Sequence, residues 1–371
     1  MSVLYVLWSV FEKCFLQDVR RNLRELSPRV HRFGGIFLSE KYKELLEQYD
    51  VKVLSTFRSR GTFQCETEQG LALLKEYHGS LQKLALEYEW KEKLAEAGFT
   101  STDRYFLTKE DSLVTYDRYR TPFVLKHYFK GRECDCRNLS DVAASCRNLA
   151  FLHKVSSSIP EIPFENLKTE TTLHLFERKN RELRSIRKFI GKVHGKNDFE
   201  LLYMKCFDAF YKEASDALAL LCNVEQKLAD TDCGMCHGAY HYHNVLILPD
   251  YSVATVNFES LCYQPYLLDF YLFLRKTLEK NHYDYAFFEA GISGYSIYRR
   301  LSEKDFIFLY LLFLYPEKFW KISNQYYNHR KSWIPPKTLE KLQKVLAQNE
   351  ERHAFLSRFA EFLKTLDTSF L

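Results

Sequence analysis

The chain divides into a short part in which apolar residues recur at every second position and a long part in which they recur with the period of a helix. Apolar and polar side chains alternate in three runs between residues 51 and 77, and turn residues at 59–61 and 69–70 separate the runs. Alternation bounded by such turns is typical of an antiparallel β-meander. The predicted strands are 51–57, 62–68 and 71–77.

A helix is predicted directly after this meander. Leu81, Leu84 and Leu94 recur with the spacing of one helix face, and Gly98 follows as a C-terminal stop, so we expect a helix over 81–97. Strand patterns then return at 105–107, 113–116 and 123–129. We therefore expect a small antiparallel sheet that carries one helix.

Beyond Gly131 the pattern is almost wholly helical. Helices are expected over 141–154, 171–193 and 199–228, and from 267 to the end of the chain. One short hairpin, 244–248 with 252–256, interrupts them. A small antiparallel sheet followed by many helices indicates an α+β fold with two lobes. The expected parts are an N-terminal helical extension 1–48, a small N-lobe 49–130 and a helical C-lobe 131–371.

Composition and charge narrow the class of protein without identifying a partner. Hydrophobic residues make up 46% and charged residues 27% of 371 positions, which is typical of a globular protein with room for two cores. The net charge of +5 does not indicate nucleic-acid binding. The best apolar run, 1–11, is too short for a membrane span. Ten scattered cysteines favour reduced thiols in a cytoplasmic protein.

The hairpin of the helical lobe carries the densest candidate chemistry. Residues 237–244 read His-Gly-Ala-Tyr-His-Tyr-His-Asn, and residues 257–259 read Asn-Phe-Glu. Phosphoryl transfer in kinases uses a carboxylate that accepts the hydroxyl proton, a metal ligand five residues further on, and a second metal-binding acid after the next strand. These three positions correspond to Ala239, Asn244 and Asn257.

The same kinase arrangement requires a lysine on the third strand and a glutamate on the following helix. Lys75 lies on the third predicted strand, and Glu87 lies on the predicted helix eleven residues before Gly98. Two interpretations remain open at this point. The two residues either hold the phosphates of a nucleotide or form a purely structural ion pair between strand and helix.

Ala239 weighs most heavily against catalysis. Its methyl group cannot accept a proton, and general-base catalysis typically contributes roughly 10²- to 10⁴-fold in rate. Asn257 offers magnesium only a neutral oxygen, although this ion prefers carboxylate oxygens. Activity would need substitutes, with Glu259 as a metal ligand and His241 or His243 as a displaced base.

A zinc site is the second chemical hypothesis for this region. Cys233 and Cys236 stand immediately before His237, and further histidines follow. Zinc fingers separate their Cys and His pairs by about 12 residues so that the chain can wrap the ion. Here the pairs are adjacent and His237 belongs to the loop, so we expect no zinc.

Several motifs together resemble the CotS family of spore coat proteins, a branch of the aminoglycoside phosphotransferase and choline kinase superfamily, over about residues 45–360. They are 58–62 (Arg-Ser-Arg-Gly-Thr), 131–135 (Gly-Arg-Glu-Cys-Asp), the 237–244 loop, Asp269 with 273–276 (Phe-Leu-Arg-Lys), and 315–320 (Tyr-Pro-Glu-Lys-Phe-Trp). The resemblance implies a bilobed, protein-kinase-like fold. It also implies that Asp269 supports the loop from the next helix by accepting hydrogen bonds. Related active kinases usually read His-Gly-Asp in this loop, and this chain departs from them at Ala239.

The resemblance further implies a protein made in the cytoplasm of the mother cell and deposited in the spore coat among other coat proteins. ATP with magnesium is the cofactor that it suggests, through the retained Lys75, Glu87 and Asn244. We therefore expect a degenerate kinase, or pseudokinase, that acts in coat assembly. The alternative is an active ATP-dependent phosphotransferase whose acceptor is a small hydroxylated molecule, a coat polysaccharide or a coat protein.

Overall fold

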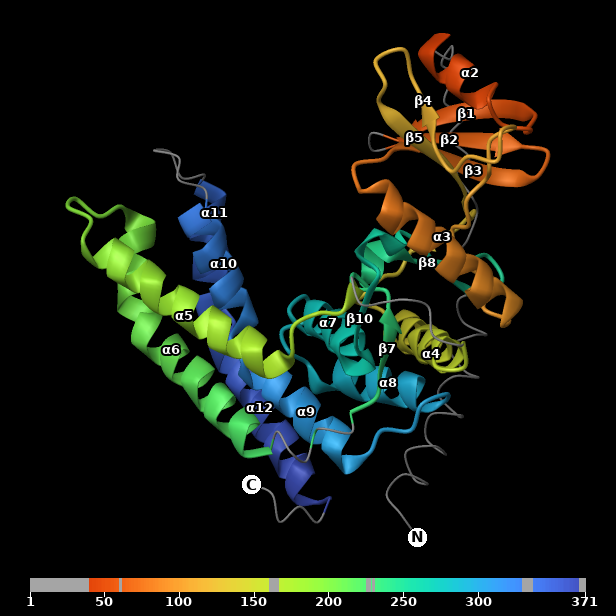
Figure 1. The fold of residues 1–371 in the computed structure, drawn as a ribbon. Coiled ribbons are helices and arrows are strands. Elements are labelled where there is room, and N and C mark those ends of the chain that lie inside the picture. Colours follow the sequence, from red (N-terminus) through yellow and green to blue (C-terminus); the bar gives the residue numbers. More distant parts are fainter. Residues whose placement is uncertain are drawn as a thin grey trace, which may run out of the picture. The chain divides into compact units, whose positions relative to one another are not determined.

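The computed structural model describes most of the chain from residue 40 onward (Figure 1). The described residues are 40–59, 62–159, 167–224, 228, 231–328 and 336–366. Of the expected N-terminal extension 1–48, only residues 40–48 are described, and they contain helix α2 (Glu40–Leu46). The rest of that expectation lies outside the described residues.

The first lobe is built on a five-stranded antiparallel sheet with the strand order β1-β2-β3-β5-β4. Its strands are β1 (Val53–Ser59), β2 (Thr62–Thr67), β3 (Gly70–Glu76), β4 (Thr115–Tyr116) and β5 (Pro122–His127). Gly70 begins β3 with a φ of +107°, a conformation that glycine adopts without a Cβ clash. Lys75 pairs with Val124 of β5 in the register, so the third strand of the meander lies in the middle of the sheet.

Helix α3 (Leu81–Glu96) follows the meander. Ser80 caps its first turn by accepting a backbone N–H, and Gly98 ends it with a φ of +97°. Its buried face includes Glu87 and Lys91, two charged residues that the apolar periodicity does not reveal.

One expected strand is absent among the described residues of this lobe. Residues 105–107 form no strand, and Tyr105 makes only a single antiparallel bridge with Lys126 of β5. The free edge of β5 is shared, because β4 pairs with its first residues through Thr115 and Phe123. Each of the two segments therefore has room for only a short ladder.

The second lobe consists mainly of helices (Figure 1). They are α4 (Leu139–Ser156), α5 (Thr172–Gly191), α6 (Asp198–Val224), α7 (Tyr266–Leu278), α8 (Tyr285–Ser296), α9 (Glu303–Leu314), α10 (Glu317–Asn328), α11 (Pro336–Ala347) and α12 (Asn349–Lys364). The small antiparallel sheet and the helical lobe confirm the α+β, kinase-like fold class expected from the sequence. Among the described residues, no helix is both long and apolar enough to cross a membrane.

Two small sheets lie within the helical lobe. One has the strand order β6-β8-β9 and the other pairs β10 with β7. Their strands are β6 (Arg132–Glu133), β7 (Cys233–Cys236), β8 (Val245–Ile247), β9 (Val253–Thr255) and β10 (Cys262–Pro265). The β8–β9 hairpin was expected from its local turn. The other three strands were not, because each is short and pairs with a segment far along the chain.

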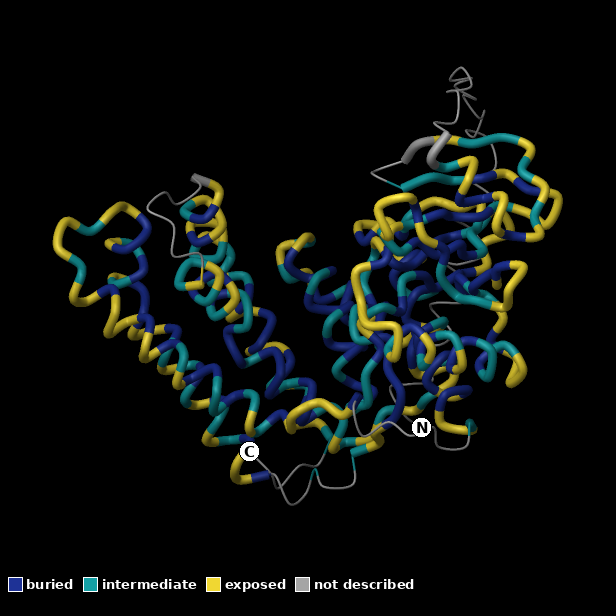
Figure 2. The backbone as a smooth tube through the Cα atoms, turned by 45° about the horizontal axis from the view of Figure 1, so that its top comes forward, coloured by how far each residue is buried: buried dark blue, intermediate teal, exposed yellow. Residues whose placement is uncertain are grey.

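The main hydrophobic core lies among the helices of the second lobe (Figure 2). Aromatic side chains fill much of it, and one example is the stacked pair Tyr203 and Phe319, whose ring centroids are 5.3 Å apart. The core continues to Leu94 of α3, so that helix packs against both lobes. The loop that carries the candidate chemistry is anchored on this core through Tyr240, which is fully buried.

Candidate functional site

The loop 237–244 between β7 and β8 has a shape fixed by its main chain. Asp269, in the first turn of α7, accepts hydrogen bonds from the backbone N–H groups of His237 (2.7 Å) and Gly238 (2.9 Å). Gly238 has a φ of +74°, and a Cβ there would lie 2.0 Å from the carbonyl oxygen of Ser260. Only glycine therefore fits at this turn.

His237 serves the loop with both of its ring nitrogens. The backbone N–H of Ala239 donates to Nδ1 (3.1 Å), and Nε2 lies 3.0 Å from the carbonyl oxygen of Val256. Since Nδ1 accepts, we assign the ring hydrogen to Nε2, which donates to that carbonyl. Burial lowers the pKa of His237, so the ring is neutral. The side chain is thus neither a free base nor an available zinc ligand.

Three positions that kinase chemistry would need lie together at this loop, and none of them carries a charge. The amide Nδ2 of Asn244 donates to the backbone oxygen of Ala239 (3.0 Å), and Nδ2 of Asn257 donates to Oδ1 of Asn244 (3.0 Å). Ala239 contributes only a methyl group to the centre. The three positions are thus close together, but neither Ala239 nor Asn257 supplies a carboxylate, whereas Asn244 is the amide that kinases use at its position.

Asn257 follows β9 and is held from the first lobe. It adopts the left-handed conformation, with φ 65° and ψ 62°, which asparagine tolerates better than most residues. Its backbone N–H donates to Oδ2 of Asp103 (2.9 Å). Asp103 comes from the stretch after α3, so a buried carboxylate of the first lobe fixes the segment at which a metal-binding acid was expected.

Lys75 and Glu87 do not pair with each other in the described part of the chain, so the second of the two open interpretations, a structural ion pair between strand and helix, is wrong for these residues. Nζ of Lys75 lies 2.5 Å from Oε1 of Glu259, whose side chain is 38% exposed. The residue two positions after Asn257 therefore supplies the partner of the third-strand lysine. Glu87 is unavailable to Lys75 because other lysines surround it.

Glu87 belongs to a buried charge network that the sequence analysis missed. Its carboxylate lies 2.6 Å from Nζ of Lys91, 3.4 Å from Nζ of Lys126 and 2.6 Å from the hydroxyl of Tyr105. Both lysines also contact Asp103, at 2.7 Å and 3.4 Å. Burial alone would raise the pKa of Glu87, but the two lysines lower it to about 2.

A weak signal for this network exists in the sequence. Lys91 stands four residues after Glu87, which is the spacing of an ion pair along one helix face. Lys126 sits inside the apolar strand β5, where a charge needs a partner. Neither pattern shows that Lys126 and Asp103 would join Glu87 and Lys91, since Asp103 lies in a loop.

The loop histidines differ in their surroundings. Nδ1 of His241 is buried and has no hydrogen-bond partner among the described residues. Burial, followed by the positive charge of Lys276, lowers the pKa of His241 to about 4, so the ring is neutral at physiological pH. His243 is half-exposed, and its Nδ1 lies 2.7 Å from a carboxylate oxygen of Glu133.

The family of the chain follows from the comparisons with known proteins. The family model described as "Spore coat putative kinase YutH" matches residues 42–359. The chain belongs to this YutH family. The match confirms the resemblance to CotS-type spore coat proteins. No curated protein matches the chain.

Solved structures similar to this member of the YutH family are phosphotransferases and small-molecule kinases. An aminoglycoside phosphotransferase from Alicyclobacillus acidocaldarius is 19% identical, with a TM-score of 0.76 over 91% of this chain and 100% of that one. The spectinomycin phosphotransferase APH(9)-Ia is 14% identical, with a TM-score of 0.60 over 84% and 96%. A microcompartment-associated aminopropanol kinase is 14% identical, with a TM-score of 0.55 over 86% and 97%. These identities establish the fold alone.

The kinase-like fold implies a nucleotide-bound magnesium ion, and the residues of this YutH-family chain do not fit one. Oδ1 of Asn244 accepts a hydrogen bond from Asn257, and Oε1 of Glu259 is engaged by Lys75. Magnesium needs oxygen ligands in near-octahedral geometry and is usually held by one or two carboxylates. The two carboxylates near Asn257 are both paired with lysines, Glu259 with Lys75 and Asp103 with Lys91 and Lys126.

Proposed function

We propose that the protein is a spore coat component built on a kinase-like scaffold whose phosphoryl-transfer centre is degenerate. The observation that carries the proposal is the loop at Ala239. Asp269 and His237 hold the main chain of this loop in a closed set of hydrogen bonds, yet no carboxylate is present to accept a hydroxyl proton. Loss of a general base costs about 10²- to 10⁴-fold in rate.

The electrostatics of the centre support the same proposal. A working kinase concentrates negative charge around its metal ions. Here Asn257 contributes a neutral amide in place of an acid, it donates a hydrogen bond to Oδ1 of Asn244, and Glu259 forms an ion pair with Lys75. Two defects at one centre, one in proton transfer and one in metal binding, make weak residual catalysis the most that we expect.

Nucleotide binding is a separate part of the proposal. Similar structures include an amicoumacin kinase solved with AMP-PNP and Ca²⁺ and the spectinomycin phosphotransferase solved with ADP. Lys75 remains on the third strand and is partly exposed, so it can contact a phosphate. We therefore propose that the protein binds ATP weakly, with little dependence on magnesium, and that binding requires Lys75 to exchange Glu259 for a phosphate oxygen.

The family indicates where in the cell the protein acts. Membership of a spore coat family supports association with the coat. We propose that the protein is made in the cytoplasm of the mother cell and then joins other coat proteins during assembly. Its contribution there comes from its surfaces and its bound ligands rather than from phosphorylation.

The experiment is an ATP titration by calorimetry, with and without magnesium, together with a phosphate-release assay. The proteins are the wild type, Ala239→Asp and the uncharged control Ala239→Asn. We expect weak ATP binding by all three and phosphate release only by Ala239→Asp, because only aspartate restores a proton acceptor. Circular dichroism and thermal unfolding of each variant confirm that the fold is intact.

The opposite outcome supports the alternative function, an active phosphotransferase. Phosphate release by the wild type that depends on magnesium would overturn the degenerate-kinase proposal. The residues to test next would then be Glu259 as a metal ligand and His241 as a base, since His241 has a buried ring nitrogen without a partner among the described residues. Absence of ATP binding would overturn the nucleotide part alone.

A further inference from the structure

A cavity of about 180 Å³ lies beside the 237–244 loop, between helices α5, α7 and α10. Its lining includes Gly238 of the loop and Asp269, and Lys179, Arg275 and Lys321 bring positive charge to it. The apolar part of the lining consists of Leu175, Phe176, Leu268, Leu272 and Leu312. Drug-sized ligands usually occupy about 300–1,000 Å³, so this cavity suits a smaller molecule.

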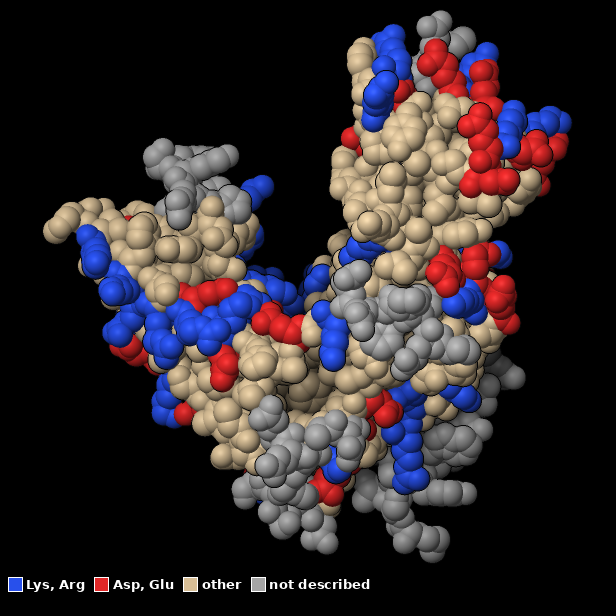
Figure 3. All heavy atoms as spheres, viewed as in Figure 1, with Lys and Arg blue, Asp and Glu red and all other residues tan. Residues whose placement is uncertain are grey.

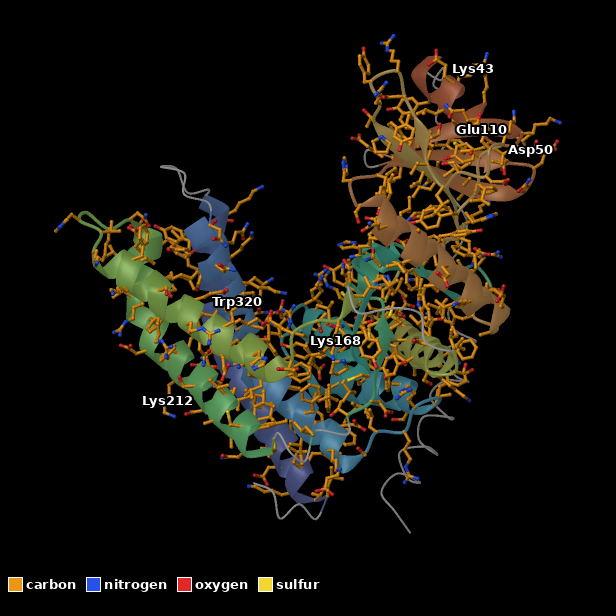
Figure 4. All side chains as sticks on the ribbon, viewed as in Figure 1. Lys43, Asp50, Glu110, Lys168, Lys212 and Trp320 are labelled. Atoms are coloured by element: carbon orange, nitrogen blue, oxygen red, sulfur yellow. The ribbon has the colours of Figure 1, made fainter. Side chains whose placement is uncertain are left out.

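Helices α5 and α10 meet at one shared carboxylate. Oε2 of Glu317 lies 2.5 Å from Nζ of the buried Lys179, and Oε1 lies 3.4 Å from Nζ of the half-exposed Lys321. Nζ of Lys179 also stands 4.4 Å from the ring centroid of Trp320, which Figure 4 shows on α10 facing α5. One acid thus serves two lysines at the edge of the cavity.

Around Arg275 of α7, one acid again serves two positively charged groups. Glu279, the residue that caps the end of α7, forms an ion pair with Arg275 and also lies 2.6 Å from Nζ of Lys318. Arg275 is 6% exposed and lines the cavity, but its Nε–H has no hydrogen-bond partner within the described ranges. A buried guanidinium donor without an acceptor is costly, and an anionic ligand would satisfy it.

The pKa of Lys276, which lies next to Arg275, indicates the same excess of positive charge. Burial, and then the charges of Arg275 and Lys321, lower the pKa of Lys276 to about 8. Figure 3 shows Lys and Arg atoms gathered along α5 and toward the hollow beside it. Asp269 is the other acid in the wall, and its oxygens already accept the two backbone N–H groups of the loop.

We propose that this cavity binds a small anion of about the size of a sugar, which carries one carboxylate or phosphate group. The anionic group would lie against Arg275 and Lys321, and the leucines and Phe176 would cover the rest of the molecule. A positively charged amine would be repelled by the same groups. Binding here needs neither nucleotide nor phosphoryl transfer, so the inference is independent of the proposed function.

Four probes with one ring and different charge test the ligand class. The full chain, without nucleotide, is titrated by calorimetry with glucose 6-phosphate, glucuronate, glucose and glucosamine. We expect binding of the two anions at millimolar or lower concentration, weakening with added salt, at least tenfold weaker binding of glucose, and none of glucosamine. Equal affinities, preference for glucosamine, or no binding of either anion at millimolar concentration would overturn the proposal.

Charge-matched variants test the location. Lys321→Gln should weaken anion binding at least threefold, and Arg275→Lys should weaken it despite keeping the charge, because Nε–H is lost. The control Lys212→Gln removes one positive charge on the outer face of α6, where its side chain is 77% exposed (Figure 4). An equal loss in the control would show non-specific attraction and overturn the assignment.

Binding at the nucleotide position is distinguished by Lys75→Met. This variant should leave the affinity for glucose 6-phosphate unchanged while it weakens ATP binding. Loss of glucose 6-phosphate binding in Lys75→Met would place the anion at the third-strand lysine instead and would overturn the cavity assignment without touching the proposal of a degenerate centre.

Discussion

At the scale of single residues, hydrogen bonds hold the main chain of the 237–244 loop, and Ala239 within it carries no acidic side chain. Asp269 accepts hydrogen bonds from two backbone N–H groups, and Gly238 occupies a turn in which a Cβ would clash. The two ring nitrogens of His237 bond to the backbone of Ala239 in the loop and of Val256, which follows β9. Ala239 then presents a methyl group from this rigid frame. We expect this frame to contribute to the stability of the helical lobe.

Neutralising Glu259 should strengthen ATP binding. Glu259 forms an ion pair with Lys75 at a partly exposed position, and its charge also repels a triphosphate. In Glu259→Gln we expect the dissociation constant for ATP to fall by up to about tenfold, equivalent to about 1.4 kcal/mol, in calorimetry. If Glu259→Gln instead binds ATP more weakly than the wild type, and does so only when magnesium is present, Glu259 is a metal ligand.

Replacing the loop-supporting aspartate should destabilise the helical lobe. In Asp269→Asn one backbone N–H of the loop would face an amide donor instead of an acceptor, and a buried unsatisfied group costs about 1–3 kcal/mol. We expect urea unfolding to show a loss of that order. Asp284→Asn is the control, because Asp284 caps α8 at the surface and asparagine caps equally well; equal losses in both variants would refute the role of Asp269.

At the scale of elements, α3 and β5 are joined by charges rather than by apolar packing alone. Glu87 and Lys91 of α3 meet Lys126 of β5 and Asp103 in a region where all four side chains are at most 2% exposed. Buried ion groups of this kind are tolerated only when every member has partners. The network fixes the helix on the sheet and, through Asp103, reaches the backbone of Asn257.

Removing one cation should leave this network unbalanced. In Lys126→Met two buried carboxylates would share only Lys91, and breaking such a buried pair typically costs about 3–5 kcal/mol. Lys130→Met is the matched control, because Lys130 is exposed and surface substitutions change stability by about 0.5 kcal/mol or less. A loss below about 1 kcal/mol in Lys126→Met would contradict the network as described.

The network should also make stability depend on pH. The two lysines hold the pKa of Glu87 near 2 in the folded protein, below its ordinary value of 4.5. The stabilisation is complete above about pH 5 and is lost as the pH falls toward 2, amounting to roughly 3 kcal/mol. Denaturant unfolding between pH 2 and 6 should show this loss in the wild type and a flatter profile in Glu87→Gln; identical profiles would count against it.

The sequence predicts the parts of the fold that local pattern controls. Alternation and the turn at Gly70 predict the meander, and Lys75 falls on its third strand as expected. The partner of Lys75 is not predictable in this way, because Glu259 is 184 positions away and its proximity depends on the packing of the whole protein. Buried charges such as Lys126 interrupt the apolar pattern, so periodicity alone describes them as surface residues.

At the scale of the whole molecule, two contacts among the described residues join the first lobe to the segment after β9. Asp103 binds the backbone of Asn257, and Lys75 binds Glu259. Both contacts connect charged or polar groups that lie far apart in the sequence.

Deposition in the coat should not depend on the kinase-like centre. A fluorescent fusion carrying Lys75→Met or Ala239→Asp should reach the spore surface in the same amount as the wild-type fusion, since neither change alters an assembly surface under our account. Fluorescence per purified spore is the measurement. A severalfold loss in Lys75→Met, with a normal cellular level of the fusion, would instead tie deposition to nucleotide binding.

Phosphate release from ATP tests most directly whether this intact scaffold lacks the chemistry of a kinase. The rate is measured at saturating ATP and magnesium for the wild type and for the double variant Ala239→Asp, Asn257→Asp, which restores both acids of a kinase centre. We predict no release above background for the wild type and a rate at least 10²-fold above it for the double variant. Magnesium-dependent release above background by the wild type would contradict this prediction.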